Sequence, residues 1–257
     1  MLTFRNTNIF FILFLAALVG YDIYSYLPFY IYLIVALIYS LLLFWGSYYV
    51  GSNFYFSIIC SAKTDKKQIA ISFDDGPVQQ FTPAILKLLK ENETPAAFFC
   101  IGKRVEENEE LLQQVYAAGH VIGNHSYSHA MWFDLFSANK MYDDLQMTDV
   151  VIKKAIGVTP KLFRPPYGVT NPNLKNAVNK GNYISVGWNI RSLDTVITDE
   201  QKLLIKVTKA LKPGAVVLFH DTGKAIPSIL PAFIKTAKDR GFEIVRLDKL
   251  LNLEPYA

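Results

Sequence analysis

The uneven distribution of charge along the chain constrains its fold more than any other feature of the sequence. Arg5 and Asp22 are the only charged side chains among the first sixty residues. One apolar stretch runs from Ile9 to Gly20 and continues less cleanly through residue 24, and a second runs from Phe29 to Trp45, with residues 46–50 extending it. Because a helix needs about 20 apolar residues to span a bilayer core, the second stretch is long enough and the first is borderline.

These stretches predict a membrane anchor over residues 1–62, built as a transmembrane helical hairpin that contacts the lipid bilayer through residues 9–50 and turns near Ser25–Pro28. Tyrosines and Trp45 gather at the ends of the stretches, as aromatic residues do at membrane interfaces. The alternative is that the first stretch is a signal peptide. It has a positive start at Arg5, but no small-x-small cleavage site follows.

The membrane orientation stays open. Arg5 flanks one end of the hairpin, Lys63, Lys66 and Lys67 flank the other, and the turn between the stretches carries Asp22. The positive-inside rule then puts both termini in the cytoplasm, whereas a single span would put the rest of the chain outside.

From residue 63 to residue 257 the character of the sequence changes to an alternation of short β-rich runs and amphipathic helical patterns. We expect strands at Ile69–Phe73, Ala97–Cys100, Val121–Gly123, Leu162–Phe163, Ile184–Val186, Ala215–Phe219 and Glu243–Arg246. We expect helices at Thr82–Glu91, Glu107–Ala118, Lys140–Ile156, Asn173–Asn179, Glu200–Leu211 and Ser228–Asp239. This order predicts an α/β fold with parallel strands, either a distorted or incomplete (β/α) barrel or a doubly wound sheet.

Composition excludes two function classes. The formal net charge is only +4, and the sequence has neither a basic stripe nor a reader motif, so we expect no nucleic-acid partner. The two cysteines, Cys60 and Cys100, lie in apolar surroundings and form no C-x-x-C pair, so we expect reduced thiols and no cysteine-built zinc site. Nothing in the sequence indicates the oligomeric state.

Polar residues follow four of the expected strands, and parallel strands of a barrel bring such residues to one face. They are Asp74-Asp75, the pair His125 and His129, Arg164 before Pro165-Pro166, and His220. The first three also have a purely structural interpretation: a solvated Asp-Gly-Pro turn, two unrelated surface histidines and a rigid structural loop. At a spacing of four, one helical turn would put the two imidazoles on one face, where they can share a metal. Taken together, these residues predict metal-assisted hydrolysis.

The same residues resemble the motifs of the polysaccharide deacetylases, the NodB-homology group or carbohydrate esterase family 4. The matching segments, in order, are residues 72–77 (SFDDGP), 125–129 (HSYSH), 164–167 (RPPY) and 218–220 (LFH). The resemblance covers residues 67–250 and implies a polysaccharide deacetylase catalytic domain over residues 63–257 with a distorted (β/α) barrel.

The resemblance also implies a role for each residue. Asp75, His125 and His129 would bind a divalent metal, commonly zinc, with cobalt or another divalent ion as alternatives. Asp74 would be the general base, held ionised by Arg164. His220 would be the general acid. Tyr167 would offer its backbone N–H to the oxyanion, and Leu218 would line the pocket for the acyl methyl.

The remaining motif usually reads as aspartate followed by tryptophan. Asp194 fits the carboxylate that orients the acid histidine, but Thr195 stands where the tryptophan would be, which leaves that wall of the pocket in doubt.

The predicted function is removal of N-linked acetyl groups from an amino-sugar polysaccharide or peptidoglycan by a hydrolase in the bacterial cell membrane. Two alternatives remain: a deacylase of a lipid-linked sugar at the membrane, and a non-catalytic carbohydrate-binding protein on the same fold.

Overall fold

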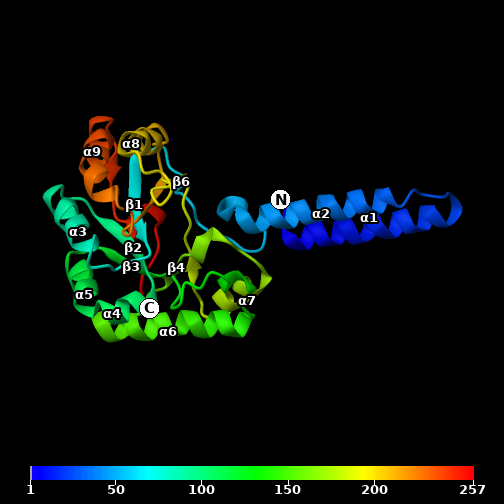
Figure 1. Ribbon diagram of the computed structural model, residues 1–257, viewed down its shortest axis with the longest axis horizontal. Coiled ribbons are helices and arrows are strands. Elements are labelled where there is room, and N and C mark those ends of the chain that lie inside the picture. The colour runs from blue at the N-terminus through cyan, green and yellow to red at the C-terminus, as the bar shows by residue number, and fades with distance from the viewer. Residues whose placement is uncertain (1) are drawn as a thin grey trace.

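The computed structural model describes residues 2–257, and Figure 1 shows a hairpin of two long helices that projects from an α/β domain. The hairpin consists of α1 (Phe4–Tyr24) and α2 (Tyr30–Tyr48). The hydroxyl of Tyr39 donates to Asn8 at 2.8 Å and ties the two helices together. Both helices are long and apolar enough to cross a membrane, and few of their residues are buried within the protein.

The domain is organised around one curled, parallel sheet. Its order is β5-β4-β3-β2-β1-β7-β6, with β8 pairing with the start of β1. The strands are β1 (Gln68–Asp74), β2 (Ala96–Cys100), β3 (Val121–Asn124), β4 (Leu162–Phe163), β5 (Ile184–Ser185), β6 (Ile190–Arg191), β7 (Val216–His220) and β8 (Glu243–Ile244). The central strands are nearly continuous apolar runs because both faces of the sheet are buried.

Helices cover the outer face of this sheet, and α3, α5, α8 and α9 lie away from the hairpin in Figure 1. Their bounds are α3 (Thr82–Glu91), α4 (Gly102–Glu107), α5 (Glu109–Ala117), α6 (Ala138–Ile156), α7 (Pro172–Lys180), α8 (Glu200–Lys209), α9 (Ile226–Asp239) and α10 (Leu247–Leu251). Phe73 of β1 stacks between Phe98 and Phe219 of the two neighbouring strands, which places the main core between the sheet and these helices.

The predicted α/β fold with an incomplete barrel is confirmed, and the doubly wound alternative is wrong because the sheet curls. The structure differs from the sequence expectation in detail. The helix expected at 107–118 is α5, and α4 is an additional helix that ends just before it, at a break where the side chain of Asn108 donates to Pro77 O and Arg104 O. Strand β6 was not expected.

Helix α3 begins at Thr82, as expected. Its cap position is Phe81, so Thr82 lies inside the first turn and its side chain does not cap the helix. Its hydroxyl is used elsewhere: it accepts from Val78 N at 2.9 Å and donates to Asp221 at 2.7 Å. Both cysteines are free thiols, as expected, with Cys100 buried and Cys60 half-buried.

The segment between the hairpin and β1 packs against the end of α2 at its start and against the domain farther along. Phe54 is buried, and its ring lies so close to Gly46 that a Cβ there would come within 2.3 Å of it. Farther along, Ile59 N donates to Ser185 O at 2.9 Å, and Ile59 O accepts from Gly187 N at 2.9 Å. Residues 59–61 therefore lie beside β5 and reach the start of β7, on the open side of the curled sheet.

This packing predicts that a chain beginning at residue 63 is less stable than one beginning at residue 49. The shorter chain lacks the buried Ile58 side chain and the backbone hydrogen bonds of Ile59. Burial of one such side chain contributes about 2–3 kcal/mol, and each kcal/mol shifts Tm by about 2–4 °C in a domain of this size. Thermal unfolding followed by circular dichroism should show a Tm lower by at least about 5 °C. Equal Tm values for the two chains would contradict the prediction.

Candidate active site

The structure brings the predicted site residues together at the carboxyl edge of the sheet. Asp74, the last residue of β1, is in register with Phe99 of β2 and with His220 of β7. The loops after β3 and β4 reach the same edge, because Asn124 and Phe163 pair there. The result is a pocket of about 240 Å³ lined by Asp74, Asp75, His125, His129, Pro165, Tyr167, Gly168, Trp188, Arg191, Thr195, Leu218 and His220.

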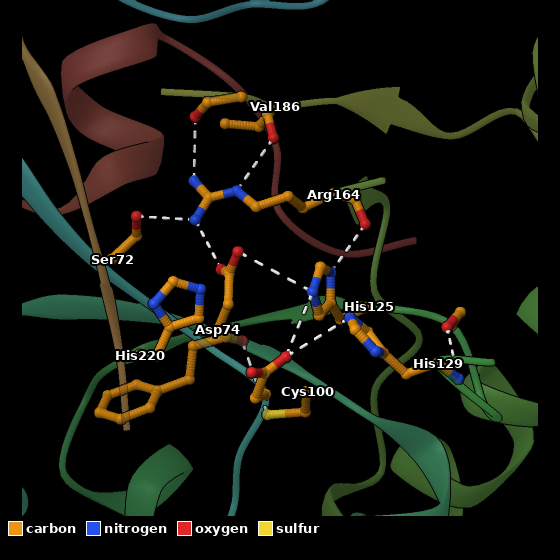
Figure 2. Close-up of polar contacts among 12 residues, drawn as sticks. Ser72, Asp74, Cys100, His125, His129, Arg164, Val186 and His220 are labelled. Carbon is orange, nitrogen blue, oxygen red and sulfur yellow. Dashed lines mark hydrogen bonds and ion pairs between the residues drawn. The ribbon is translucent and has the colours of Figure 1, made fainter. Parts of the chain in front are cut away.

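Three of these side chains form a group with the composition of a metal site. One ligand atom each from Asp75, His125 and His129 lies within 4.8 Å of the others. The Nε2 atoms of His125 and His129 are 3.6 Å and 3.5 Å from the same oxygen, Asp75 Oδ1. Figure 2 shows the rings of His125 and His129 side by side.

The protonation of the two histidines suits metal binding. Burial lowers the pKa of His125 to about 3 and also lowers the pKa of His129, so both imidazoles are neutral at pH 7. The Nδ1–H of His125 donates to Arg164 O at 2.8 Å, which leaves the lone pair of Nε2 facing Asp75. A second-sphere hydrogen bond of this kind is typical of metal-ligating histidines. One carboxylate and two neutral imidazoles are a donor set that fits zinc.

From their spacing we expected the two histidines to share a helical turn, but they do not. Residues 125–130 form an irregular loop, and Ser126 and His129 both have positive φ, at 65° and 42°. The backbone also bends sharply at Asp75 and Tyr167, with φ of 81° and 59°. Non-glycine residues with such φ values are strained, and they concentrate here around one pocket, as is common at functional sites.

Asp74 is buried beside the metal-site group and is paired with Arg164. Arg164 Nη1 donates to Asp74 Oδ1 at 2.6 Å, while Asp74 Oδ2 lies 3.9 Å from His125 Nε2. Burial raises the pKa of Asp74 above that of an ordinary aspartate, and the charges of Arg164 and His220 oppose this rise. One carboxylate oxygen is thus held by the guanidinium and the other faces the pocket (Figure 2).

His220 lies on the other side of Asp74 from His125 in Figure 2. Its Nδ1 donates to Asp194 Oδ1 at 2.7 Å, and its backbone N–H donates to Asp194 Oδ2 at 2.7 Å. Burial lowers the pKa of His220, but the hydrogen bond to Asp194 and the nearby carboxylates raise it to a net value of about 9. The imidazole is therefore protonated at neutral pH, and Nε2 carries the proton that it can release.

The remaining predicted residues line the same pocket. Leu218 is buried in its wall, and Tyr167 lies at its edge, half exposed, with its hydroxyl donating to His129 O at 3.2 Å. Thr195 also reaches the pocket, so the position expected to carry tryptophan is part of the wall. Trp188 lines the pocket as well and packs against Arg164, with the guanidinium carbon 5.6 Å from the ring centroid.

Asp221 is a site residue to which the sequence reasoning assigned no role. It is fully buried, its Oδ2 accepts from Thr82 at 2.7 Å, and its backbone N–H donates to Asp74 O at 3.2 Å. It packs so closely on Gly76 that a Cβ there would lie 1.8 Å from Asp221 Oδ2. Asp221 therefore braces the turn that carries Asp74 and Asp75. Its position directly after His220 was the only signal for it.

A second buried network supports the histidine loop. Asn124 Oδ1 accepts from Ser126 N at 2.8 Å, and Asn124 Nδ2 donates to Asp149 Oδ1 at 2.8 Å. Asp149 in turn accepts from the hydroxyl of Tyr183 at 2.5 Å. Asp149 and Tyr183 belong to segments far from the motifs in sequence, so no sequence signal marked them.

The fold and the site together define a hydrolase of the α/β, NodB type. The polysaccharide deacetylase family profile matches residues 61–186. A peptidoglycan-N-acetylglucosamine deacetylase of Bacillus cereus is 34% identical over 196 residues, which cover 73% of this chain and 89% of that protein. The chain belongs to the polysaccharide deacetylase family, which makes it a hydrolase of carbon–nitrogen bonds other than peptide bonds.

Solved structures agree with this assignment. A peptidoglycan N-acetylglucosamine deacetylase superposes with a TM-score of 0.73 at 28% identity, covering 78% of this chain and 95% of that one. A carbohydrate esterase family 4 pseudoenzyme from Bacillus anthracis superposes with a TM-score of 0.70 at 25% identity, covering 76% and 68%. The fold is thus found both in enzymes and in a pseudoenzyme.

The bond between Asp194 and His220 predicts a pH effect. In the Asp194→Asn variant, the pKa of His220 loses its main upward contribution, so the alkaline limb of kcat/KM should move down from near pH 9 by at least about one unit. The change is measured as a pH profile of turnover. Asp143→Asn, which removes an exposed carboxylate of α6, is the matched control and should leave the limb in place. An unshifted limb in Asp194→Asn would show that Asp194 does not tune His220.

The burial of Asp221 predicts a pH-dependent stability. Burial raises the pKa of Asp221 to about 7, whereas the unfolded value is 3.8, so between these values the folded state binds the extra proton. The free energy of unfolding should therefore fall as pH rises from about 4 to 7, by a few kcal/mol from this group. Denaturant unfolding of Asp221→Asn at several pH values should show a shallower fall than the parent chain. Parallel curves would contradict the assignment.

Proposed function

We propose that the chain removes acetyl groups from N-acetylated amino sugars of a peptidoglycan-type glycan. We further propose that Asp75, His125 and His129 bind a divalent metal for this reaction, with zinc as the first candidate. The observation that carries the proposal is the position of Asp74 between this three-residue group and His220 (Figure 2). The printed names of the relatives, peptidoglycan deacetylases, support the choice of substrate.

The metal would leave coordination positions open, since the group supplies only three protein ligands. When bound, it would act as a Lewis acid on the amide carbonyl and lower the pKa of water.

The chain's own residues would carry the proton transfers. Asp74 Oδ2 accepts a proton from the attacking water, and Arg164 holds the other oxygen of this carboxylate in place. The backbone N–H of Tyr167 donates to the developing oxyanion, a type of contribution worth about 3–4 kcal/mol per donor. Nε2 of His220 then gives its proton to the amine as the C–N bond breaks, so that acetate and a free amino sugar are released. Leu218 borders the space for the acetyl methyl group.

We further propose that residues 1–62 anchor the enzyme in the bacterial cell membrane through a helical hairpin and that residues 63–257 form the catalytic domain. The length and hydropathy of α1 and α2 support the anchor. The turn between them is polar and self-contained, because Asp22 accepts from Leu27 N at 2.6 Å and from the hydroxyl of Tyr32 at 3.0 Å.

The proposal predicts that the purified chain, supplied with zinc or cobalt, releases acetate from N-acetylglucosamine oligomers and from peptidoglycan. Removal of the metal by a chelator should abolish this release. Asp75→Ala and His125→Ala should lose metal binding, measured by elemental analysis, and turnover together. Asp74→Asn should keep the metal and lose turnover by about a hundredfold or more.

Two outcomes would contradict these assignments. Normal turnover in Asp74→Asn would remove Asp74 as the base. Metal uptake without acetate release from any N-acetylated glycan would favour the alternative of a non-catalytic carbohydrate-binding protein. A pseudoenzyme with the same fold is known.

A further inference from the structure

The end of the hairpin is joined directly to the loop that borders the pocket. Thr170 N donates to Ser47 O at 3.0 Å, and Thr170 Oγ1 donates to Gly46 O at 3.1 Å. Val50, just after α2, lies 3.6 Å from where a Cβ on Gly168 would be. Thr170 follows Tyr167 by three residues, so the pocket edge lies within about 11 Å of a residue bonded to the last turn of α2.

That last turn of α2 has the composition of a membrane interface. Trp45, Tyr48 and Tyr49 are all exposed there, and aromatic residues of this kind settle at the level of lipid headgroups. Thr170, bonded to Gly46 and Ser47, is therefore at that same level when the hairpin spans a bilayer. Figure 1 shows β4 and α7, which flank this loop, on the side of the domain from which the hairpin projects.

An exposed apolar turn lies next to the loop of Thr170. Met131, Trp132 and Leu135 are 72%, 65% and 72% exposed, although they are large and apolar. They follow His129 closely, in the loop between β3 and α6, and we call them the apolar rim. Single exposed apolar residues are ordinary, but three large ones on one turn beside a pocket indicate a binding surface.

The apolar rim is tied to the segment that meets the hairpin. Asn171 Nδ2 donates to Asp134 O at 2.6 Å, and Asn173 Nδ2 donates to Phe136 O at 3.0 Å. Asn171 follows Thr170 directly, so the hydrogen bonds run from α2 through residues 170–171 to the turn that carries the rim. The hairpin therefore sets the height of the rim relative to a bilayer.

We propose that the apolar rim inserts into the bilayer interface and that the pocket acts on an N-acetylated amino sugar that is attached to a membrane lipid. This inference rests on the deacetylase function and the membrane anchor proposed above. A substrate tethered to the same surface reaches the pocket at a high effective concentration, whereas a soluble glycan has no such advantage.

The test uses the full chain with zinc in vesicles of dioleoylphosphatidylcholine and dioleoylphosphatidylglycerol. Acetate release is measured from a disaccharide of N-acetylglucosamine carried on a dialkylglycerol and from the methyl glycoside of the same disaccharide. We expect kcat/KM to be at least about tenfold higher for the lipid conjugate, a gain of the size that tethering supplies.

Variants separate the rim from general effects. Met131→Ser, Trp132→Ser and Leu135→Ser combined should lower kcat/KM for the lipid conjugate at least about threefold and leave the methyl glycoside within about twofold. The matched control combines Met147→Ser, Val150→Ser and Ile205→Ser, which remove three exposed apolar side chains from α6 and α8, and should change neither value.

The outcomes distinguish the two proposals. Equal kcat/KM for both substrates, or a rim variant that lowers both equally, would overturn the membrane-presented substrate and leave the deacetylase function standing. Acetate from neither substrate would overturn the deacetylase function itself and this inference with it.

Discussion

The guanidinium of Arg164 is fully buried, and burial of a charge is tolerated only where hydrogen bonds and a counter-charge compensate it. Its donors reach Ser72, Asp74, Val186 and Gly187, and its own carbonyl accepts from His125. The side chain also stacks 3.9 Å above the ring of Phe99. One residue of the loop after β4 thus joins β1 and β2 to the segments that follow β3 and β5.

This arrangement couples stability to the proposed chemistry. Removal of one partner from a buried ion pair typically costs 3–5 kcal/mol because the other charge stays buried. Arg164 and Asp74 are therefore interdependent: the carboxylate that faces the pocket is in place because the guanidinium holds its other oxygen. Asp221 and Asp149 support two neighbouring motif loops through buried hydrogen bonds, and neither lines the pocket.

The junction of the hairpin with the domain is the second organising feature. The segment after α2 buries Val50, Phe54 and Ile58 and adds hydrogen bonds beside β5, so the hairpin is joined to the α/β domain by a packed segment. Thr170 connects that junction to the loop of Tyr167, which explains how a hairpin far from the motifs in sequence can set the position of the pocket edge. The same contacts give the apolar rim its place.

The amino-acid sequence by itself determined the apolar hairpin, the strand–helix order and the residues at the strand ends, because each of these follows from local pattern: length, periodicity and position after an apolar run. Local pattern also misled, since the spacing of His125 and His129 indicated a helical turn where the chain forms a loop with positive φ. Only the tertiary structure decided the break at Asn108, strand β6, the use of Thr82 by Asp221 and the contact of Thr170 with α2. These depend on groups far apart in the chain that meet when the sheet curls, and no local pattern carries that information.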